Sequence, residues 1–165
     1  MSPKIKRFNL EAHIHFVTSK TKNATQIFSN KNVAQLFVST LLNCRKRYKF
    51  LLFGFVVMPD HFHALIQPDK DYSISQVMQK IKSLFAYEYR KVSKTNGSIW
   101  QKSFYDFVLN SGKKLIEKIN YVHYNPVRKG MVSSPEEYPF SSIGILDQMD
   151  LSWAFGCEQS HEQDS

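Results

Sequence analysis

Four short stretches of the chain carry the apolar pattern of β-strands: either strict alternation with polar residues or a continuous buried run. These stretches are residues 11–18, 50–58, 61–67 and 100–109. In the first, His13 and His15 would share one face of the strand. The second and third are separated only by Pro59 and Asp60, a pair typical of a tight turn, so they predict an antiparallel hairpin.

Three other stretches repeat apolar residues every three or four positions, which predicts amphipathic helices. They cover residues 33–44, 73–92 and 111–125. Ser73 and Gln76 have the spacing of a capping box at the start of the second helix, whose inward face would include Val92. The third helix should end near Asn125, because Pro126 follows and disfavours helix in the residue before it.

The predicted order of elements is β-α-β-β-α-β followed by one more helix. This order indicates an α+β fold, a ferredoxin-like antiparallel sheet with helices, extended by a C-terminal helix that carries tyrosines. With 165 residues and 42% hydrophobic content, the chain can build one substantial core. We expect a single domain over residues 1–146 and an acidic, disordered tail over residues 147–165.

The charges are distributed very unevenly along the chain. All 22 Lys and Arg residues and 7 acidic residues lie within positions 1–129, a net charge of +15, while the last 36 residues hold 7 acidic residues and no Lys or Arg. A body with that excess favours a polyanionic partner such as nucleic acid. No apolar run approaches membrane-spanning length and no secretory signal is seen, so we expect a soluble, intracellular protein.

His61 and His63 form the most informative candidate metal-binding motif of the chain. Alternate side chains on a strand share a face, so the two imidazoles would point the same way, the spacing of a two-histidine metal clamp. Imidazole suits transition metals, and with oxygen ligands it also suits Mg²⁺ or Mn²⁺. The alternative is that both residues are merely polar positions on the exposed face of a half-buried strand.

The third helix offers a candidate nucleophile. Its apolar positions mark a core face, and Lys114, Lys118, Tyr121 and Asn125 form a stripe roughly opposite. A tyrosine on a basic, outward stripe is available for chemistry or for stacking on a base. Asn125, one turn beyond Tyr121, has an amide oxygen able to bind a hard cation. Tyr124 is the rival nucleophile, without a ligand partner on its own helix.

Four ordered segments resemble a known family. They are residues 57–63 (VMPDHFH), 100–106 (WQKSFYD), 121–132 (YVHYNPVRKGMV) and 138–142 (YPFSS). They are similar to the histidine strand, penultimate segment, tyrosine helix and exit of the single-tyrosine HUH transposases, an IS200-like group, and within it of the REP-associated tyrosine transposases. Phe107 departs from the pattern, because many relatives have a histidine after the Tyr-Asp pair.

The resemblance implies a metal-dependent single-strand DNA endonuclease and strand transferase. Tyr121 would attack a phosphodiester of a DNA hairpin to give a 5′-phosphotyrosine intermediate, with Mg²⁺ or Mn²⁺ held by His61, His63 and Asn125. The substrate would be single-stranded DNA with imperfect palindromes. A monomer or homodimer in the bacterial cytoplasm, associated with the nucleoid, would carry out the reaction.

We expect seven basic residues to contact DNA phosphates. They are Lys114, Lys118 and Arg128 near the tyrosine, and Arg45, Arg47, Arg90 and Lys91 at the ends of the first two helices. The alternative for any one of them is a solvated charged surface.

Two other functions stay open at the level of sequence. His13, His15, His61 and His63 could together form a four-histidine site of a metallohydrolase or oxygenase, if the two strands lie adjacent with their histidine faces together. A domesticated, non-catalytic hairpin-binding protein would show the same segments. The acidic tail could also lie over the basic groove and mimic DNA.

Overall fold

The structure, a computed structural model with side chains, describes residues 13–151. Its main elements are β1 (Ile14–Lys20), α1 (Lys31–Tyr48), β2 (Leu51–Met58), β3 (His61–Gln67), α2 (Ile74–Ser93), β4 (Tyr105–Leu109) and α3 (Gly112–Arg128). Short 3-10 helices are η1 (Lys22–Ala24), η2 (Ile27–Ser29), η3 (Pro135–Glu137) and η4 (Ser142–Gln148). The predicted order of strands and helices is confirmed.

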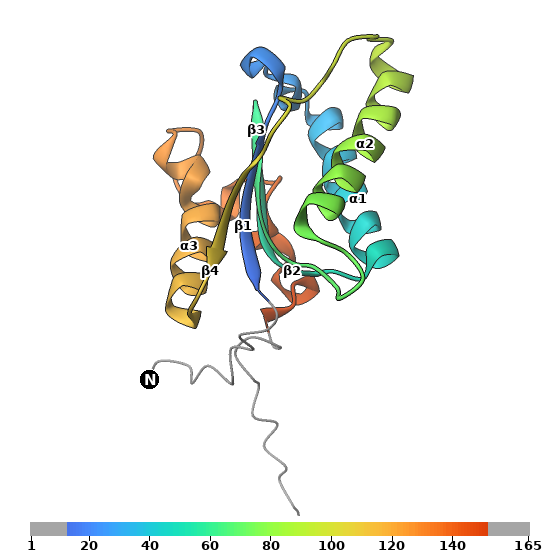
Figure 1. The fold of residues 1–165 in the computed structure, drawn as a ribbon. Helices are drawn as coiled ribbons and strands as arrows, with labels where there is room; N and C mark the ends of the chain where they lie inside the picture. The colour runs from blue at the N-terminus through green and yellow to red at the C-terminus, as the bar shows by residue number, and fades with distance from the viewer. Residues whose placement is uncertain (1–12, 152–165) are drawn as a thin grey trace, which may run out of the picture.

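The four strands form one antiparallel sheet in the order β2-β3-β1-β4. Helices α1 and α2 cover one face of this sheet, and α3 covers the other, so the molecule is a helix-sheet-helix sandwich (Figure 1). This arrangement confirms the α+β class and the ferredoxin-like strand order.

Each face of the sheet has its own hydrophobic core. The larger core, under α1 and α2, is rich in aromatic rings such as Phe37, Phe62 and Phe85, while the smaller one joins the sheet to Leu115 and Val122 of α3. Because strand side chains alternate, Phe62 enters the large core while the histidines on either side of it face α3. A slip of one residue would bury both histidines in the large core, so burial fixes the register of β3.

Local signals in the sequence account for the helix starts. The side chain of Asn30 accepts hydrogen bonds from the backbone N–H groups of Asn32 and Val33, and so caps α1. Ser73 and Gln76 form the predicted capping box of α2. Both helices end in a lysine with left-handed backbone, Lys49 with φ 56° and Lys94 with φ 55°.

Two predicted element boundaries and one predicted core position are wrong. Helix α3 continues through Pro126 to Arg128, because a proline in the last turn removes one hydrogen bond and leaves the earlier ones intact. Strand β4 begins at Tyr105, not at Trp100, which makes only an isolated bridge to Thr21. Val92 is 68% exposed, since it lies in the last turn of α2 beyond the reach of the core.

The domain extends past the expected boundary at residue 146. The carboxylate of Asp150 accepts a hydrogen bond of 2.8 Å from the backbone N–H of Leu52 and pairs with Arg45 at 2.8 Å, and Met149 is buried. Residues 147–151 therefore belong to the folded body, and Asp150 joins them to α1 and β2. The rest of the predicted tail, 152–165, lies outside the described residues, as does the proposal that it covers a basic groove.

Within residues 13–151, no helix is long and apolar enough to cross a membrane. Cys44 is a free, fully buried thiol on α1, and burial raises its pKa to about 11. It acts as a small core residue.

Candidate active site

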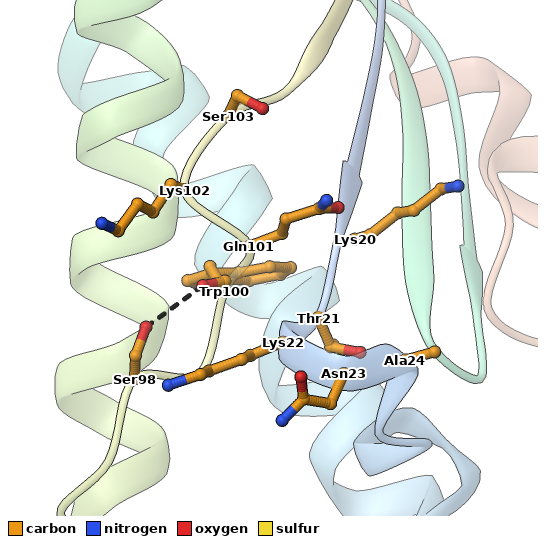
Figure 2. A pocket seen from close by; sticks show the side chains of 10 residues that line it. All are labelled: Lys20, Thr21, Lys22, Asn23, Ala24, Ser98, Trp100, Gln101, Lys102 and Ser103. Atoms are coloured by element: carbon orange, nitrogen blue, oxygen red, sulfur yellow. Dashed lines mark hydrogen bonds between the residues drawn. The ribbon is translucent and has the colours of Figure 1, made fainter.

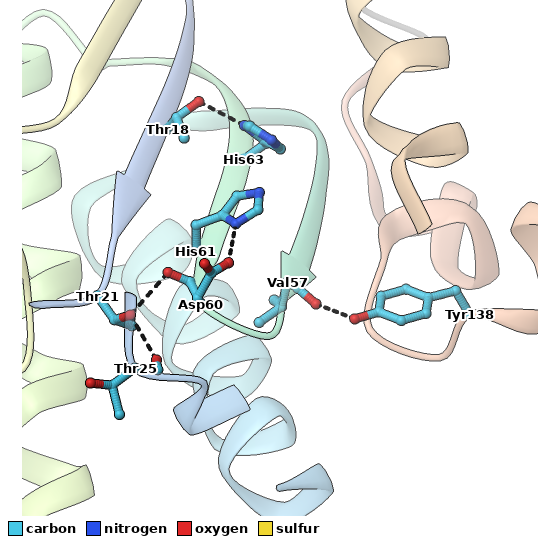
Figure 3. A network of polar contacts seen from close by, with 8 residues as sticks. All are labelled: Thr18, Thr21, Thr25, Val57, Asp60, His61, His63 and Tyr138. Atoms are coloured by element: carbon cyan, nitrogen blue, oxygen red, sulfur yellow. Dashed lines mark hydrogen bonds and ion pairs between the residues drawn. The ribbon is translucent and has the colours of Figure 1, made fainter. Parts of the chain in front are cut away.

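The histidine pair lies on β3, on the face of the sheet that α3 covers. The ring centroids of His61 and His63 are 4.8 Å apart, and neighbouring groups hold both rings. The Thr18 hydroxyl lies 2.7 Å from Nδ1 of His63, and the Asp60 carboxylate lies 2.6 Å from Nδ1 of His61 (Figure 3). Neither contact is evident from the sequence, because Thr18 reaches His63 only through the register that pairs β1 with β3.

These hydrogen bonds determine which ring nitrogens are available. A carboxylate only accepts, so Nδ1 of His61 must carry the proton and Nε2 is left as the lone-pair donor when the ring is neutral. The Thr18 hydroxyl, which can donate or accept, contacts Nδ1 of His63 and leaves Nε2 of that ring outside this contact. Metal-binding histidines are usually oriented by such outer partners, and here the Nε2 atoms of both rings lie away from them.

The electrostatic surroundings keep His63 neutral. Its pKa is lowered to about 3, first by burial and then by the nearby charges of His61, Lys118, Arg128 and Lys20. A neutral imidazole has the free lone pair that a metal ion requires. His63 therefore would not need to lose a proton to bind a metal ion at physiological pH.

Tyr121 lies beside this pair. Its ring contacts His63 at 5.6 Å and Phe16 at 5.8 Å between centroids, both edge to face, and the residue remains 40% exposed. The prediction of an outward stripe is thus only partly right. The tyrosine is accessible to a ligand, yet it lies at the margin of the small core against the sheet. Tyr124 is 49% exposed and has no ring contact with either histidine of the pair in the described chain.

Two cations surround the tyrosine ring. The Arg128 guanidinium carbon lies 4.5 Å and the Lys118 ammonium 5.3 Å from the ring centroid of Tyr121. Arg128 also donates a hydrogen bond to the Tyr121 carbonyl. Lys118 is enclosed by three rings, because Phe16 and Phe107 lie 4.8 Å and 5.4 Å from it. The predicted phosphate contacts Lys118 and Arg128 therefore border the candidate nucleophile.

Asn125 differs from its prediction as an outward residue. It is 3% exposed, one turn after Tyr121 on α3, and its side chain makes no hydrogen bond to another residue of the described chain. Residues 13–151 contain no cluster of three His, Cys, Asp or Glu side chains suited to a metal. A metal bound by His61 and His63 would therefore need an amide or water oxygen, and the side chain of Asn125 on α3 carries an oxygen of that kind.

A cationic cavity adjoins the histidine pair. It measures about 650 Å³ and lies between η1 and the segment before β4 (Figure 2). Its lining residues include three lysines and no carboxylate; they are Lys20, Thr21, Lys22, Asn23, Ala24, Ser98, Trp100, Gln101, Lys102 and Ser103. Lys20 pairs with His61 across the sheet and so connects the cavity to the histidines. Asn23 and Ala24 both have left-handed backbone, with φ 58° and 53°, a strained turn of the kind that clusters at binding sites.

The other predicted DNA contacts are not brought to the tyrosine. Lys114 lies on α3 and makes an exposed ion pair with Glu117 at 3.7 Å. The rest lie on α1 and α2, beyond the opposite face of the sheet, with partners of their own: Arg45 with Asp150, Arg47 with Tyr48, Arg90 with the Gly97 carbonyl, and Lys91 with Glu88.

The four-histidine site is wrong. Thr18 pairs directly with His63 and so shares its face, whereas His15 is three residues earlier on β1 and therefore points to the other face. There it pairs with Asp106 at 2.8 Å. The alternation of β1 thus separates the two histidine pairs by the thickness of the sheet.

Comparison with known proteins identifies the class that this fold and site define. The family model described as "Transposase IS200 like" matches residues 6–125, and the chain belongs to this family. The match spans the histidine pair, the tyrosine and Asn125.

Three of the relatives are described more narrowly, as REP-associated tyrosine transposases. The chain is 23% identical over 140 residues to the REP-associated tyrosine transposase of Escherichia coli, covering 84% of this chain and 81% of that protein. It is 26% identical over 140 residues to a Haemophilus influenzae protein assigned to the same type, covering 79% of each. Among solved structures, a REP-associated tyrosine transposase bound to a REP hairpin superposes with a TM-score of 0.69 at 22% identity, over 88% of this chain and 84% of that one. A Deinococcus radiodurans protein assigned as a transposase superposes with a TM-score of 0.54 at 16% identity, over 78% and 97%.

Proposed function

We propose that this protein is a REP-associated tyrosine transposase that binds DNA hairpins and cleaves and rejoins single-stranded DNA through Tyr121. The observation that carries the proposal is the contact between Tyr121 and His63, which brings an accessible phenol within 5.6 Å, ring to ring, of a neutral, oriented imidazole. The hairpin substrate is proposed from the description of the structural relative, and the cleavage chemistry is proposed from the residues of the site.

The reaction is a transesterification. The Tyr121 oxygen would attack the phosphorus, the bond from phosphorus to the 3′ oxygen would break, and the phenol proton would be lost as the 3′ oxygen gains one. The products are a 5′-phosphotyrosine and a free 3′-hydroxyl, so the bond energy is kept for rejoining. Lys118 and Arg128, both beside the Tyr121 ring, would bind the phosphate oxygens and stabilise the negative charge of the transition state.

A divalent ion, Mg²⁺ or Mn²⁺, completes the proposal. His61 and His63 would hold it through Nε2, and Asn125 through its amide oxygen. The ion would supply charge to polarise the phosphate and stabilise the transition state. Asp60 and Thr18 orient the two imidazoles and so determine the geometry of the pair.

The cationic cavity supports a single-stranded substrate. It is lined by Lys20, Lys22 and Lys102 without an acidic residue, and Trp100 and Gln101 lie between them. A smaller cavity of about 290 Å³, which includes Thr18 and Lys20 in its wall, connects this region to the histidine face. We propose that a single strand leaving the scissile phosphate follows this route, its phosphates neutralised by the lysines.

Tyr121 and His63 come from one chain, which supports an active site built within a single subunit. The protein would act as a monomer, or as a homodimer with two complete sites, on DNA in the bacterial cytoplasm.

A covalent-adduct assay tests the proposal. The full chain is incubated with end-labelled hairpin DNA from beside its own gene and with Mn²⁺, and the products are separated on a denaturing gel. The wild type should give a protein-DNA adduct, which Tyr121→Phe abolishes. Tyr124→Phe is the matched control, because this tyrosine has no contact with the histidine pair, and it should keep the adduct. An adduct that survives in Tyr121→Phe and disappears in Tyr124→Phe would reverse the assignment, and hairpin binding without any adduct would favour a non-catalytic binder.

A further inference from the structure

Two aromatic side chains of β4 lie exposed beside the candidate active site. Tyr105 is 58% exposed and Phe107 is 39% exposed. Within residues 13–151, β4 is an edge strand of the sheet, and it lies next to α3 in Figure 1. A single exposed aromatic residue needs no explanation, but two on one strand that borders a candidate nucleophile form a surface suited to a ligand.

The register of the sheet puts Tyr105 on the same face as the histidine pair. Thr18 of β1 lies opposite His63 on one side and opposite Tyr105 on the other. Residues opposite each other in neighbouring strands share a face, and the Thr18 hydroxyl contacts His63 on the face that α3 covers (Figure 3). With strands about 4.8 Å apart, the backbone of Tyr105 is about 10 Å from that of His63. Tyr105 thus belongs to the row of residues that crosses the sheet at the candidate active site.

Phe107 extends this aromatic surface toward the candidate nucleophile. It lies opposite Phe16, whose ring contacts the Tyr121 ring at 5.8 Å between centroids. The ammonium of Lys118 lies 5.4 Å from the centroid of the Phe107 ring and 5.3 Å from that of the Tyr121 ring, so this cation lies between the two. A phosphate bound by Lys118 would therefore bring the base attached to it next to the rings of β4.

The Tyr105 ring has no partner of its own in the described chain. Neither a ring contact nor a hydrogen bond of its side chain is found within residues 13–151. The residue forms part of the wall of the cavity of about 290 Å³ that also includes Thr18 and Lys20. A tyrosine side chain has only two rotatable side-chain angles, so ordering it against a ligand costs little entropy. The ring is therefore available to stack on a planar group that enters this cavity.

The charges around Tyr105 favour a ligand that carries phosphate. Lys20 shares the cavity wall with Tyr105, and no acidic side chain belongs to that wall. Neither Lys20 nor Lys118 takes part in an ion pair within the described residues. Asp106, the carboxylate of β4, points to the opposite face of the sheet, where it pairs with His15. An aromatic surface flanked by lysines is the combination by which proteins bind single-stranded nucleic acid.

We propose that Tyr105, bordered by Phe107, is the stacking platform for an unpaired base that flanks the scissile phosphate. The base would lie against the Tyr105 ring, while Lys20 and Lys118 bind phosphates on either side of it. The platform thereby positions the strand so that its phosphorus faces Tyr121. Because every base has a π-face that can stack, Tyr105 contributes position and not sequence preference. This inference rests on the proposed function, which provides the DNA substrate.

A fluorescent base tests this contact without cleavage. Hairpin DNA from beside the gene carries 2-aminopurine, whose emission falls when it stacks, at one unpaired position of its single-stranded flank in each sample. The DNA is bound to full-length Tyr121→Phe protein, which keeps an aromatic ring at this position but cannot form the adduct. We expect one position, adjoining the cleavage position, at which emission is lower with this protein than with Tyr121→Phe/Tyr105→Leu. Tyr105→Phe in the same background keeps the ring and should keep the low emission.

Binding affinity provides a second readout in the same background. Tyr105→Leu should weaken DNA binding about tenfold, a typical loss for one stacked base. An abasic nucleotide at the responding position should weaken binding by the same factor, and Tyr105→Leu should then cause no further loss. A merely structural role of Tyr105 would instead weaken the binding of both DNAs equally. Tyr87→Leu removes a similarly exposed tyrosine on α2; it is the matched control and should leave binding unchanged.

The outcomes separate the stacking platform from the proposed cleavage. A position at which emission and affinity both depend on the Tyr105 ring would support the platform. Hairpin binding without any such position, or equal losses on intact and abasic DNA, would overturn it. No binding of hairpin DNA at all would overturn both the platform and the proposed function. A base that depends on Tyr105, without any adduct from the wild-type protein, would support stacking and refute cleavage.

Discussion

The hydroxyl of Ser142 links the tyrosine helix to the sheet, and its removal provides a sharp test of how the site is held. The Oγ atom lies 2.7 Å from Nε2 of His123 on α3 and accepts a hydrogen bond of 3.0 Å from the backbone N–H of Phe55 on β2. Ser142 is fully buried and His123 is 4% exposed. Burial lowers the pKa of His123, so the ring is held neutral in this contact. Tyr121 is two residues from His123 on the same helix.

The expected effect of Ser142→Ala follows from these contacts. The substitution leaves the buried His123 nitrogen and the Phe55 N–H without a partner, and each unpaired group destabilises by about 1–3 kcal/mol. With partial relaxation we expect a loss of about 2–4 kcal/mol in the free energy of unfolding, and a lower rate of adduct formation because Tyr121 is held less firmly.

Urea unfolding and single-turnover adduct formation measure the two effects. Ser83→Ala, an exposed serine on α2, is the control and should change the free energy of unfolding by less than about 0.5 kcal/mol. The double variant Ser142→Ala/His123→Phe also removes the His123 nitrogen that Ser142→Ala leaves without a partner. Its loss in the free energy of unfolding should therefore be about 1–2 kcal/mol smaller than the summed losses of the two single variants. Strict additivity, or a Ser142→Ala protein as stable as the control, would refute the reasoning.

Three further predictions concern the histidine pair, the C-terminal segment and alkaline stability. His61→Ala should abolish metal-dependent cleavage yet leave hairpin affinity nearly intact in a filter-binding assay; retained cleavage would remove this residue from the metal site. A chain that ends at residue 145 should melt at a lower temperature than one that ends at residue 151, because it lacks Asp150 and its bonds to α1 and β2; equal melting temperatures would show that the segment is not part of the folded body. The hydroxyl of Tyr138 donates a hydrogen bond to the Val57 carbonyl, and burial raises the pKa of Tyr138 to about 12. The folded protein therefore keeps the phenol proton that the unfolded chain loses near pH 10. The stabilising contribution of Tyr138 should therefore be full below about pH 10 and disappear between about pH 10 and 12, whereas Tyr138→Phe should lack this decline in urea unfolding at different pH values.

The strand and helix order could be predicted because local periodicity and burial agree in this chain. The nine-residue apolar run before Pro59 and the capping box at Ser73 each encode their element locally, and the structure has both. Pro126 shows the limit of such rules. It is compatible with helix because it falls in the last turn, where few backbone bonds remain to be lost, and this position depends on where the helix ends in the folded protein.

The shared face of the histidine pair was predictable from the sequence, but the surroundings of the candidate site were not. The spacing of His61 and His63 guarantees a shared face, but their outer partners depend on tertiary pairing: Thr18 is 45 positions away and meets His63 only through the register of β1 with β3. Asn125 was expected to face outward, because helical spacing alone does not reveal how far a helix is rotated against its sheet. Arg45 shows the same limit. It was expected to contact DNA, but it pairs with Asp150, which is far along the chain and is brought close only by the fold.

The charges around the histidine pair are those that would attract a phosphodiester. Lys118, Arg128 and Lys20 all act to lower the pKa of His63, so without a ligand the site holds excess positive charge beside a neutral imidazole. Repulsion among these groups would destabilise the free protein, and a bound phosphate relieves it. Two of them, Lys118 and Arg128, also lie against the Tyr121 ring. The groups that would bind the substrate phosphate thus border the proposed nucleophile, so substrate binding and cleavage should both fall when Lys118 or Arg128 is neutralised.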